Sequence, residues 1–349
     1  MGKRGGTWMA AWLALGAMLA AGAQAGVQSD PVHDGAPAAA PLLVLHGGAG
    51  VERDSLAAAE EAAARQALAR ALQAGHAVLR EGGAALDAVT AAIAVLEDAP
   101  EFNAGRGAVF THDGHNALDA AVMDGTSGRA GAIAGVRRVR NPIRLARAVM
   151  EASPHVMLAG EGAEAFAAAR GIELVDPSWF RTDKRWRQLQ QARAREQGQA
   201  ATAPAHPYFG TVGAVALDAR GGLAAGTSTG GMTNKRWGRI GDSPIIGAGT
   251  WADARCAVSG TGWGEYYIRA AAAHEICARV RLAGQPLVQA AAEVINRDIP
   301  AAGGNGGAIA LGADGSIALP FNTGGMYRGW VGADGVPHVA VFDEPLPLP

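Results

Sequence analysis

The pattern of apolar and polar residues predicts several alanine-rich helices. Residues 56–80 are rich in Ala, Glu, Leu and Arg and stop at a glycine pair, as expected of a helix with a glycine terminator. A second helix is predicted over residues 85–98, where a proline follows. Asn141 precedes a proline, which is typical of an N-cap and a first-turn residue, so a helix is expected from there to about residue 152. Another helix fits residues 160–170.

Short apolar segments bounded by turn residues predict strands. Residues 42–45 form a strand candidate that ends in a glycine-rich turn, HGGAG, at residues 46–50. Residues 108–111 and 117–123 flank an Asp-Gly turn and predict a hairpin.

The second half of the chain continues this mixture of hairpins and helix pairs. A strand is expected at about 255–259, helices near 264–282 and 286–297, and a hairpin about residues 313–315. The mixture favours an α+β fold, with antiparallel sheets and helices outside, over a regular alternation of strand and helix.

The hairpin that begins at Thr211 allows its register to be predicted. Its two apolar strands flank a turn-like stretch at residues 218–222. If Leu217 pairs with Leu223, antiparallel register places Thr211 opposite Thr229. Thr229 could then hold the Thr211 hydroxyl in a reactive rotamer. The alternative is that both are ordinary strand residues whose hydroxyls satisfy each other.

Cleavage between Gly210 and Thr211 would give one residue two catalytic groups. A threonine hydroxyl is a weak nucleophile, but a new α-amine has a reference pKa of about 7.7–8 and can act as its general base near neutral pH. This junction therefore predicts a self-cleaving hydrolase with Thr211 as the nucleophile.

Two later segments carry candidate binding groups. Arg239 could grip a substrate carboxylate with two parallel hydrogen bonds, and Asp242 could hold an ammonium group. The alternative for this spacing is a solvated surface ion pair. Thr261 and Gly262 lie in a glycine-rich segment before a predicted helix and could form an oxyanion hole, although such a helix entry can also bind phosphate or nothing.

Composition and charge narrow the class of partner. The chain has 349 residues and a formal net charge of −2, and its Lys and Arg residues form no basic stripe. A nucleic-acid partner therefore has little support, and a small-molecule substrate is expected. The chain also carries no Cys/His cluster of the kind that binds metals.

Two segments, residues 1–25 and 181–206, differ in composition from the rest of the chain. Residues 1–25 have a positive start, a short apolar run and small residues at 23–25, which is the pattern of a secretory signal peptide. The run is shorter than the roughly 20 residues that a spanning helix needs, so we expect an exported protein, periplasmic in a Gram-negative source, without a membrane partner after the signal is removed. Residues 181–206 are rich in Gln, Arg, Ala and Pro, and the stretch at about 190–210 is interpreted as a mobile linker.

Two cysteines are present, Cys256 and Cys277. In an oxidising compartment they could pair, but separate burial as small apolar residues is equally compatible with the sequence.

Several segments match one family in order. They are GTVGAVALD (210–218), GTSTGGMTNK (226–235), GRIGDSP (238–244), GTGWGE (260–265) and PFNTGGMYR (320–328), together with HGGAG (46–50), FNAG (102–105) and LDAAVMDG (118–125). The set resembles the plant-type L-asparaginases with isoaspartyl peptidase activity, which are N-terminal nucleophile hydrolases. The resemblance spans the chain apart from the leader and the linker.

This resemblance implies a role for each matching residue. Thr211 would be the nucleophile released after Gly210, and Thr229 its hydroxyl partner. Thr261 and Gly262 would form the oxyanion site. The groups implied to bind the substrate are Arg239, Asp242, Gly264 and Asn103.

The resemblance also implies a structural sodium ion but no cofactor for catalysis. The loop at residues 96–106 would hold the ion through main-chain carbonyl oxygens. The matching positions are Leu96, Glu97, Ala99, Phe102, Ala104 and Arg106.

The implied architecture is a four-layer αββα sandwich of the N-terminal nucleophile hydrolase type. The precursor would be cut into an α subunit (residues 26–210) and a β subunit (residues 211–349) that form one domain, and two such heterodimers would pair. The expected substrates are L-asparagine and β-aspartyl dipeptides, with aspartate as product.

Trp263 and Gly324 depart from the family pattern, and both could change which leaving group fits. Trp237 and Trp263 could narrow the entrance or stack on a peptide side chain, or simply pack. Two other functions stay open at this point: a glycosylasparaginase, which shares the nucleophile, and a non-catalytic periplasmic amino-acid-binding protein.

Overall fold

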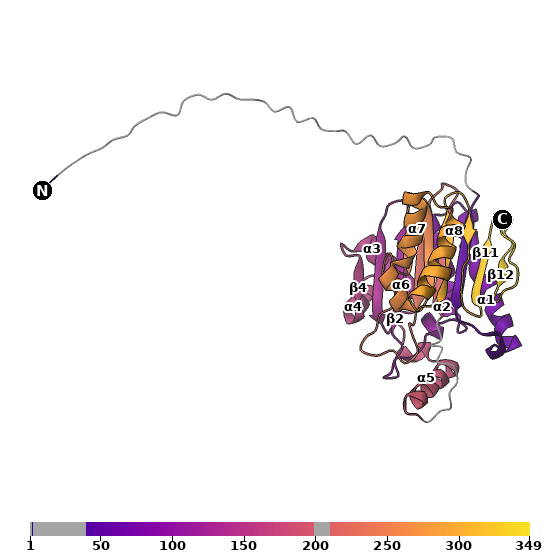
Figure 1. Ribbon diagram of the computed structural model, residues 1–349. Helices are drawn as coiled ribbons and strands as arrows, with labels where there is room; N and C mark the ends of the chain where they lie inside the picture. Colours follow the sequence, from indigo (N-terminus) through magenta and orange to yellow (C-terminus); the bar gives the residue numbers. More distant parts are fainter. Residues whose placement is uncertain (1, 3–39, 199–209) are drawn as a thin grey trace. The chain divides into compact units, whose positions relative to one another are not determined.

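The largest element is an eight-stranded sheet in a computed structural model that describes residues 2, 40–198 and 210–349 (Figure 1). Neighbouring strands are antiparallel except for one parallel pair, the last two in the order that follows. That order is β12 (His338–Ala340), β11 (Met326–Val331), β1 (Leu42–Ala49), β5 (Val212–Leu217), β6 (Leu223–Thr229), β2 (Leu118–Asp124), β3 (Ala130–Val136) and β4 (Met157–Ala159).

A second, four-stranded antiparallel sheet packs against the first. Its order is β10 (Ile317–Ala318), β9 (Gly306–Gly312), β8 (Cys256–Gly262) and β7 (Thr250–Ala252). Strands β1, β5 and β6 contact β8, and apolar side chains such as Val215, Ile309 and Leu311 fill the space between the sheets. Strands β1, β5 and β6 are buried along their whole length, as expected of strands covered on both faces.

Helices cover the outer side of each sheet. Helices α1 (Ala58–Arg80), α2 (Ala85–Asp98) and α3 (Pro142–Ala152) pack on the large sheet through a core that includes Leu72 and Ile93. Helices α7 (Ala272–Ala283) and α8 (Leu287–Glu293), drawn in orange in Figure 1, pack on the small sheet. The predicted α+β class with antiparallel sheets is confirmed, and the described residues from 40 onward belong to one compact unit.

The remaining helical elements are short or peripheral. They are α4 (Gly160–Ala169), α5 (Asp183–Glu196), α6 (Gly264–Ala270), α9 (Ile299–Ala301), the 3₁₀ turns η1 (Arg53–Ser55), η2 (Gly105–Gly107) and η3 (Pro177–Phe180), and the π-helical turn η4 (Val294–Asp298). The single helix predicted over 264–282 is two helices, because Ala271 adopts a left-handed φ of 46° between α6 and α7. Within the described residues, no helix combines the length and the apolar character needed to span a bilayer.

Two sequence predictions need correction. The hairpin predicted from residues 108–111 and 117–123 is reduced to one antiparallel bridge, Phe110 with Asn116, across the Asp-Gly turn, because β2 pairs with β3 and β6 instead. The linker predicted from about residue 190 begins too early, since α5 extends to Glu196. The side chain of Thr182 caps that helix, and buried Arg185 anchors it through a hydrogen bond to the Gly107 carbonyl. Residues 199–209 and the predicted signal peptide, except Gly2, lie outside the described residues.

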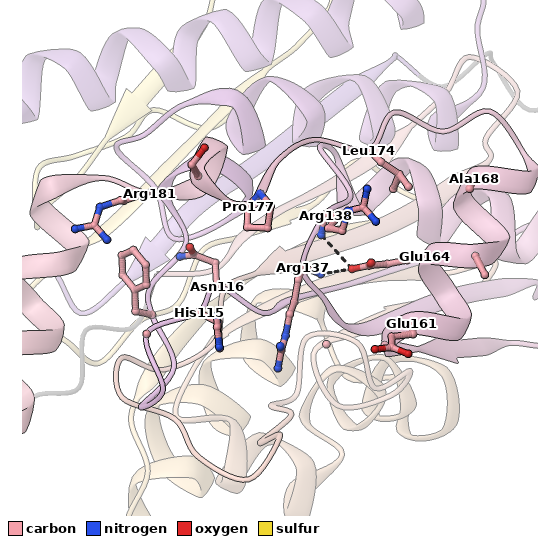
Figure 2. Close-up of a pocket in the computed structure, with 16 residues that line it drawn as sticks. His115, Asn116, Arg137, Arg138, Glu161, Glu164, Ala168, Leu174, Pro177 and Arg181 are labelled. Atoms are coloured by element: carbon pink, nitrogen blue, oxygen red, sulfur yellow. Dashed lines mark hydrogen bonds between the residues drawn. The ribbon is translucent and has the colours of Figure 1, made fainter.

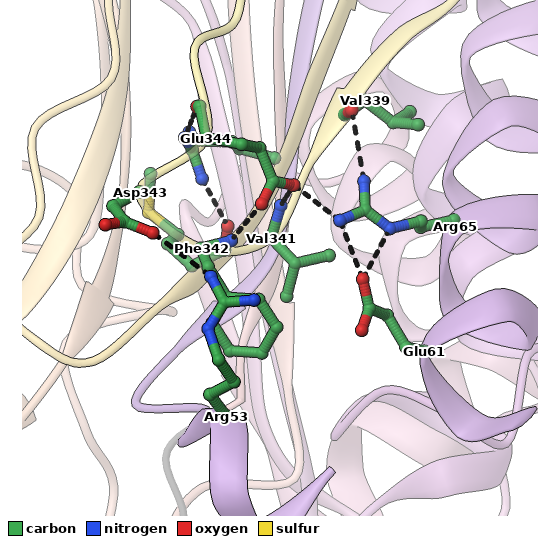
Figure 3. A network of polar contacts seen from close by, with 10 residues as sticks. Arg53, Glu61, Arg65, Val339, Val341, Phe342, Asp343 and Glu344 are labelled. Carbon is green, nitrogen blue, oxygen red and sulfur yellow. Dashed lines mark hydrogen bonds and ion pairs between the residues drawn. The ribbon is translucent and has the colours of Figure 1, made fainter. Parts of the chain in front are cut away.

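The C-terminal segment is tied to α1 by an ion-pair network (Figure 3). Arg65 bridges the carboxylates of Glu61 and Glu344 and also donates to the Val339 carbonyl. Glu344 accepts the main-chain N–H of Val341 as well. The side chains of this network are about 30% exposed, so we expect a modest stabilising effect from it.

A disulfide joins Cys256 of β8 to Cys277 of α7, which are 21 positions apart in sequence. Both residues are buried, so the bond lies inside the core that α7 shares with the small sheet. The two cysteines therefore pair, which resolves the alternatives that the sequence left open.

Removing this disulfide should destabilise the protein by roughly 3 kcal/mol, because closing a loop of this length restricts the unfolded chain by about that amount. The Cys256→Ala/Cys277→Ala double variant should therefore unfold at a lower urea midpoint than the wild type. Adding a reductant should lower the wild-type midpoint and leave the double variant unchanged. Equal midpoints for both proteins without reductant would contradict the expectation.

Candidate active site

Thr211 and Thr229 meet at the open end of the β5–β6 hairpin. The register pairs Leu217 with Leu223 and Gly213 with Thr227, as predicted. The Thr211 hydroxyl donates to the Thr229 hydroxyl at 3.1 Å, and both residues are buried. The predicted contact between the two hydroxyls is therefore present.

Asn103 holds the chain that follows Thr229. Its side-chain amide donates to the Gly231 carbonyl at 2.7 Å, while its Oδ1 accepts the main-chain N–H of Val109 at 2.9 Å. The N–H of Gly231 donates in turn to the Thr229 hydroxyl at 2.9 Å. Asn103 thus lies near Thr211 and Thr229, as the resemblance implied, and it is connected to the Thr229 hydroxyl through Gly231.

The loop that carries Asn103 is anchored under β6 by Glu97. The Glu97 carboxyl accepts from the Ser228 hydroxyl at 2.6 Å and from the Ile143 N–H at 2.9 Å. Complete burial raises the pKa of Glu97 to about 8, which favours the neutral form of this side chain. A neutral carboxyl in the core can fix the loop to the strand of Thr229 without a buried charge.

His46 is a site residue that sequence reasoning did not single out. It ends the apolar part of β1 opposite Gly213, and its Nδ1 lies 2.9 Å from the Thr211 carbonyl oxygen. Because a carbonyl only accepts, Nδ1 carries the proton. Burial lowers the pKa of His46 to about 3, so the imidazole is neutral. The polar residue that opens the HGGAG turn after an apolar strand was the available signal.

A chain of buried hydroxyls continues from His46 into the small sheet. His46 Nε2 lies 2.9 Å from the Ser259 hydroxyl, which lies 2.7 Å from that of Thr227. Thr250 donates to Thr227 at 2.7 Å. These hydroxyls connect the two sheets directly behind Thr211 and satisfy one another there, as buried polar groups must.

Gly48 and Gly210 approach each other closely at the predicted cleavage point. Gly48 has a φ of 110°, and a Cβ there would lie 2.5 Å from the Gly210 Cα and 3.1 Å from the Thr211 nitrogen. On the other side, a Cβ on Gly210 would lie 3.0 Å from that of Asn103. Gly210 also lines a pocket of about 60 Å³ with Phe102. Gly210 thus lies between Gly48 of β1 and Asn103, and a side chain at Gly48 or Gly210 would displace a neighbour.

The two predicted clamps lie beside Gly264. A Cβ on Gly264 would come within 2.8 Å of Asp242 Oδ1 and 2.9 Å of Arg239 Nη2. Asp242 is buried, and within the described residues its Oδ2 has no hydrogen-bond partner. Burial raises the pKa of Asp242 to about 7, although nearby Arg239 opposes that shift. A buried carboxyl poised in this way suits a ligand cation.

Arg239 itself pairs with Glu265, which sequence reasoning did not consider. Its Nε and Nη2 donate to the two carboxylate oxygens at 2.9 Å each. The surface Arg–Asp pair considered as an alternative is absent from the described contacts, because Arg239 makes its ion pair with Glu265. No spacing rule connects residues 26 positions apart, so only the fold could show this partner.

Thr261 and Gly262 end β8 immediately before α6. The Thr261 hydroxyl accepts the main-chain N–H of Ala49 at 3.2 Å, three residues beyond His46 on β1. Its carbonyl accepts from the Tyr267 hydroxyl at 3.3 Å. The segment is thus held near the end of β1 that supports Thr211, and its role as an oxyanion site stays a prediction.

A groove of about 960 Å³ elsewhere on the molecule contains none of the predicted site residues (Figure 2). Three arginines line it, Arg137, Arg138 and Arg181, and Glu164 accepts the main-chain N–H groups of the first two at 2.6 and 3.1 Å. Size alone would select this groove, but the nucleophile, its hydroxyl partner and the clamps lie elsewhere.

Two buried threonine hydroxyls in contact at a strand end, a neutral histidine beside them and a glycine junction with little room for a side chain are compatible with an N-terminal nucleophile hydrolase site, and similarity to known proteins agrees with this class. Residues 39–341 match a family model described as asparaginase. The chain is 49% identical over 311 residues to the isoaspartyl peptidase of Escherichia coli (strain K12), covering 87% of this chain and 96% of the relative. For the isoaspartyl peptidase of Salmonella typhimurium the identity is 48% over 309 residues, covering 87% and 99%.

A human relative named isoaspartyl peptidase/L-asparaginase is 44% identical over 232 residues, covering 66% of this chain and 73% of the relative. The chain therefore belongs to the plant-type asparaginase and isoaspartyl peptidase family of hydrolases, which confirms the resemblance seen in its motifs.

A buried ion pair fixes the loop between the nucleophile's partner and the clamps. Lys235 Nζ lies 3.6 Å from Asp119 Oδ2, with side chains 3% and 1% exposed, and donates to the Ala117 carbonyl at 2.9 Å. The lysine also blocks any side chain at Gly231, whose Cβ would lie 2.8 Å from Nζ. The sequence did not predict this pair, since a lysine in a polar loop is expected to be exposed.

Breaking this pair on one side should be costly. Asp119→Asn keeps the oxygen that accepts the Gly135 N–H but leaves Lys235 without its counter-ion, so a loss of about 3–5 kcal/mol is expected. Replacing both partners, as Asp119→Asn with Lys235→Met, removes the uncompensated charge and should restore part of that loss. The urea midpoints of the wild type, Asp119→Asn and the double variant measure these changes in stability. A double variant no more stable than Asp119→Asn would contradict the expected cost of an unpaired Lys235.

Proposed function

We propose that the protein is a self-cleaving threonine hydrolase that removes the side-chain amide of L-asparagine and hydrolyses β-aspartyl dipeptides, releasing L-aspartate. The observation that carries the proposal is the 3.1 Å contact between the Thr211 and Thr229 hydroxyls at a junction occupied by glycine. The E. coli and Salmonella relatives named isoaspartyl peptidase support it.

Self-cleavage would separate residues 26–210 from residues 211–349. In the uncut chain Thr211 is 7% exposed, and Gly210 occupies the space between Gly48 and Asn103. Cutting the bond frees the Thr211 amine and lets the preceding segment leave that space. The two pieces stay associated because β5 pairs with β1 and β6 pairs with β2, across the two subunits.

In the proposed reaction the Thr211 amine accepts the proton of its own hydroxyl, and the oxygen attacks the substrate's side-chain carbonyl. Thr261 and Gly262 stabilise the oxyanion. Ammonia or an amino acid leaves with a proton from the amine, and the aspartyl ester remains on Thr211. Water then attacks the ester and frees aspartate, with no redox or organic cofactor involved.

In the proposed binding mode the protein contacts the α-carboxylate and the α-ammonium group of the substrate. Arg239 binds the α-carboxylate, and Asp242 binds the α-ammonium group. The unpartnered Oδ2 of Asp242 supports this, because a buried carboxylate without a partner gains most from an incoming cation. Gly264 leaves room between the two groups.

We also propose the structural sodium site in the loop that contains Asn103. A Cβ on Gly105 would lie 2.3 Å from the Glu97 carbonyl oxygen. A Cβ on Gly107 would lie 1.9 Å from the Phe102 carbonyl oxygen. Main-chain oxygens thus crowd this loop, which suits a hard cation. The carbonyls that would hold it are those of Leu96, Glu97, Ala99, Phe102, Ala104 and Arg106. A bound ion would stiffen the loop and so position Asn103.

Three further features belong to the proposal. The contacts of α1–α3 with one sheet, of the two sheets with each other, and of α7 and α8 with the other sheet support a four-layer αββα sandwich. The disulfide supports export to an oxidising compartment, as the signal-peptide pattern of residues 1–25 indicates. A pair of α–β heterodimers rests on the family resemblance.

The remaining alternatives separate by substrate. A glycosylasparaginase would release a sugar amine from glycosylasparagine, whereas the proposed enzyme prefers asparagine and β-aspartyl dipeptides. The non-catalytic binding protein has lost its support, since the chain belongs to a family of hydrolases. A panel of these substrates on matured enzyme ranks the two enzymatic readings.

Purified protein should consist of two chains, the smaller beginning Thr-Val-Gly. Thr211→Ala should remain a single chain and release no aspartate, because it lacks the hydroxyl that both cleavage and turnover need. Thr229→Val, of matched shape, should still fold but lose activity by roughly two orders of magnitude. Electrophoresis, N-terminal sequencing and an aspartate assay measure this. Full activity from an unbroken chain would overturn the proposal.

Inhibition by the product L-aspartate should depend on pH through Asp242. Its pKa of about 7 means that the carboxyl is neutral below that pH and charged above it, so attraction for the ammonium group is present above pH 7 and lost as pH falls. The inhibition constant should rise about tenfold per pH unit below 7. Asp242→Asn should bind weakly at every pH, and an unchanged pH dependence in that variant would exclude Asp242 as the responsible group.

A further inference from the structure

Arg239 is held from one side by a carboxylate of the protein itself. The Nε and Nη2 bonds to Glu265, both 2.9 Å, form a two-pronged contact, and the Arg239 side chain is 19% exposed. A guanidinium has five N–H groups, so the contact leaves the edge formed by Nη1 and the second N–H of Nη2 for another acceptor.

Two glycines leave space for the guanidinium at this position. A Cβ on Gly241 would lie 2.7 Å from Nη1, and one on Gly264 would lie 2.9 Å from Nη2. Any larger residue at either place would push the group away from Asp242. The bonds to Glu265 therefore hold Arg239, and the lack of a side chain at Gly241 and Gly264 leaves room for its guanidinium.

Glu265 is also connected to the aromatic residue of the glycine-rich segment. The Trp263 side chain hydrogen-bonds to the Glu265 carboxylate, and its ring packs edge-on against Tyr266 at 5.2 Å between centroids. One carboxylate thus fixes both the clamp for a substrate carboxylate and the bulky residue next to Gly262.

We propose that Glu265 is a positioning residue for substrate recognition: it holds one edge of Arg239 so that the other edge meets the α-carboxylate of the substrate. The inference rests on the proposed function. The opposite role, in which Glu265 competes with the substrate for Arg239, predicts tighter binding once the carboxylate is removed. Because the contact uses only one edge of the guanidinium, the positioning role is the one that the geometry favours.

The test compares Glu265→Gln and Glu265→Ala on matured enzyme. KM for L-asparagine and a β-aspartyl dipeptide should rise roughly tenfold in the alanine variant, because Arg239 regains side-chain freedom that it must lose again when substrate binds. The rise should be smaller in the glutamine variant. kcat should stay within about twofold, and self-cleavage should be unaffected, since neither uses the α-carboxylate. L-Asparagine α-amide, which lacks that carboxylate, should show the same KM in all three proteins.

Glu275→Gln is the matched control, because Glu275 makes a similar ion pair with Arg279 on α7 and is 43% exposed against 47% for Glu265. Its KM should equal that of the wild type. A lower or unchanged KM in the Glu265 variants, or an equal shift for the α-amide, would overturn the positioning role. Calorimetry of L-aspartate binding tests the same contact without turnover, so a wild type that binds aspartate but releases none would refute the proposed function alone.

Discussion

The antiparallel register of β5 and β6 is the constraint on which the site depends. It sets Thr211 opposite Thr229 and aligns Gly213 with both Thr227 and His46. A shift by one residue would turn every side chain of β5 to the other face and separate the two hydroxyls. Such a shift is opposed from both sides, because β5 lies between β1 and β6 inside an eight-stranded sheet and is fully buried. The nucleophile therefore sits at the end of one of the most constrained strands of the molecule.

Burial then decides which groups near this strand carry charge. His46 is neutral because burial lowers its pKa, and Glu97 is neutral because burial raises its pKa. Both can support the nucleophile through hydrogen bonds alone, without the cost of an unpaired charge in the core. At the clamps the situation differs, since Arg239 is paired with partly exposed Glu265 and Asp242 has a pKa of about 7. Around Thr211 the buried groups are thus neutral or, as with Lys235 and Asp119, paired with an opposite charge, whereas Asp242 keeps an oxygen that has no hydrogen-bond partner within the described residues.

How far the sequence could predict this structure depended on the distance between the interacting residues. The hairpin of Thr211 was predictable to the residue, because a short turn between two apolar strands determines local pairing. Helix α2 matched its predicted bounds for the same reason. The hairpin at 108–123 failed because β2 finds better partners in β3 and β6, the latter about 100 positions away. His46 with Ser259 and Lys235 with Asp119 are likewise contacts that only the folded sheets create. The family motifs identified the residue types at the site but not which of these residues form hydrogen bonds or ion pairs with one another.

The two ends of the site are therefore built on different physical principles, and this has a consequence for how the family can vary. Around Thr211 the support consists of hydrogen bonds and one ion pair among buried groups, where a substitution leaves an unsatisfied partner and disturbs the fold. Around Arg239 the support is an ion pair near the surface next to Gly241 and Gly264, where a substitution changes the position of one flexible side chain. The residue between the two regions, Trp263, hydrogen-bonds toward the clamp while its main chain continues the segment of Thr261. Changes in substrate preference are thus most easily accommodated between Trp263 and Arg239, because the strands that hold Thr211 are not involved there.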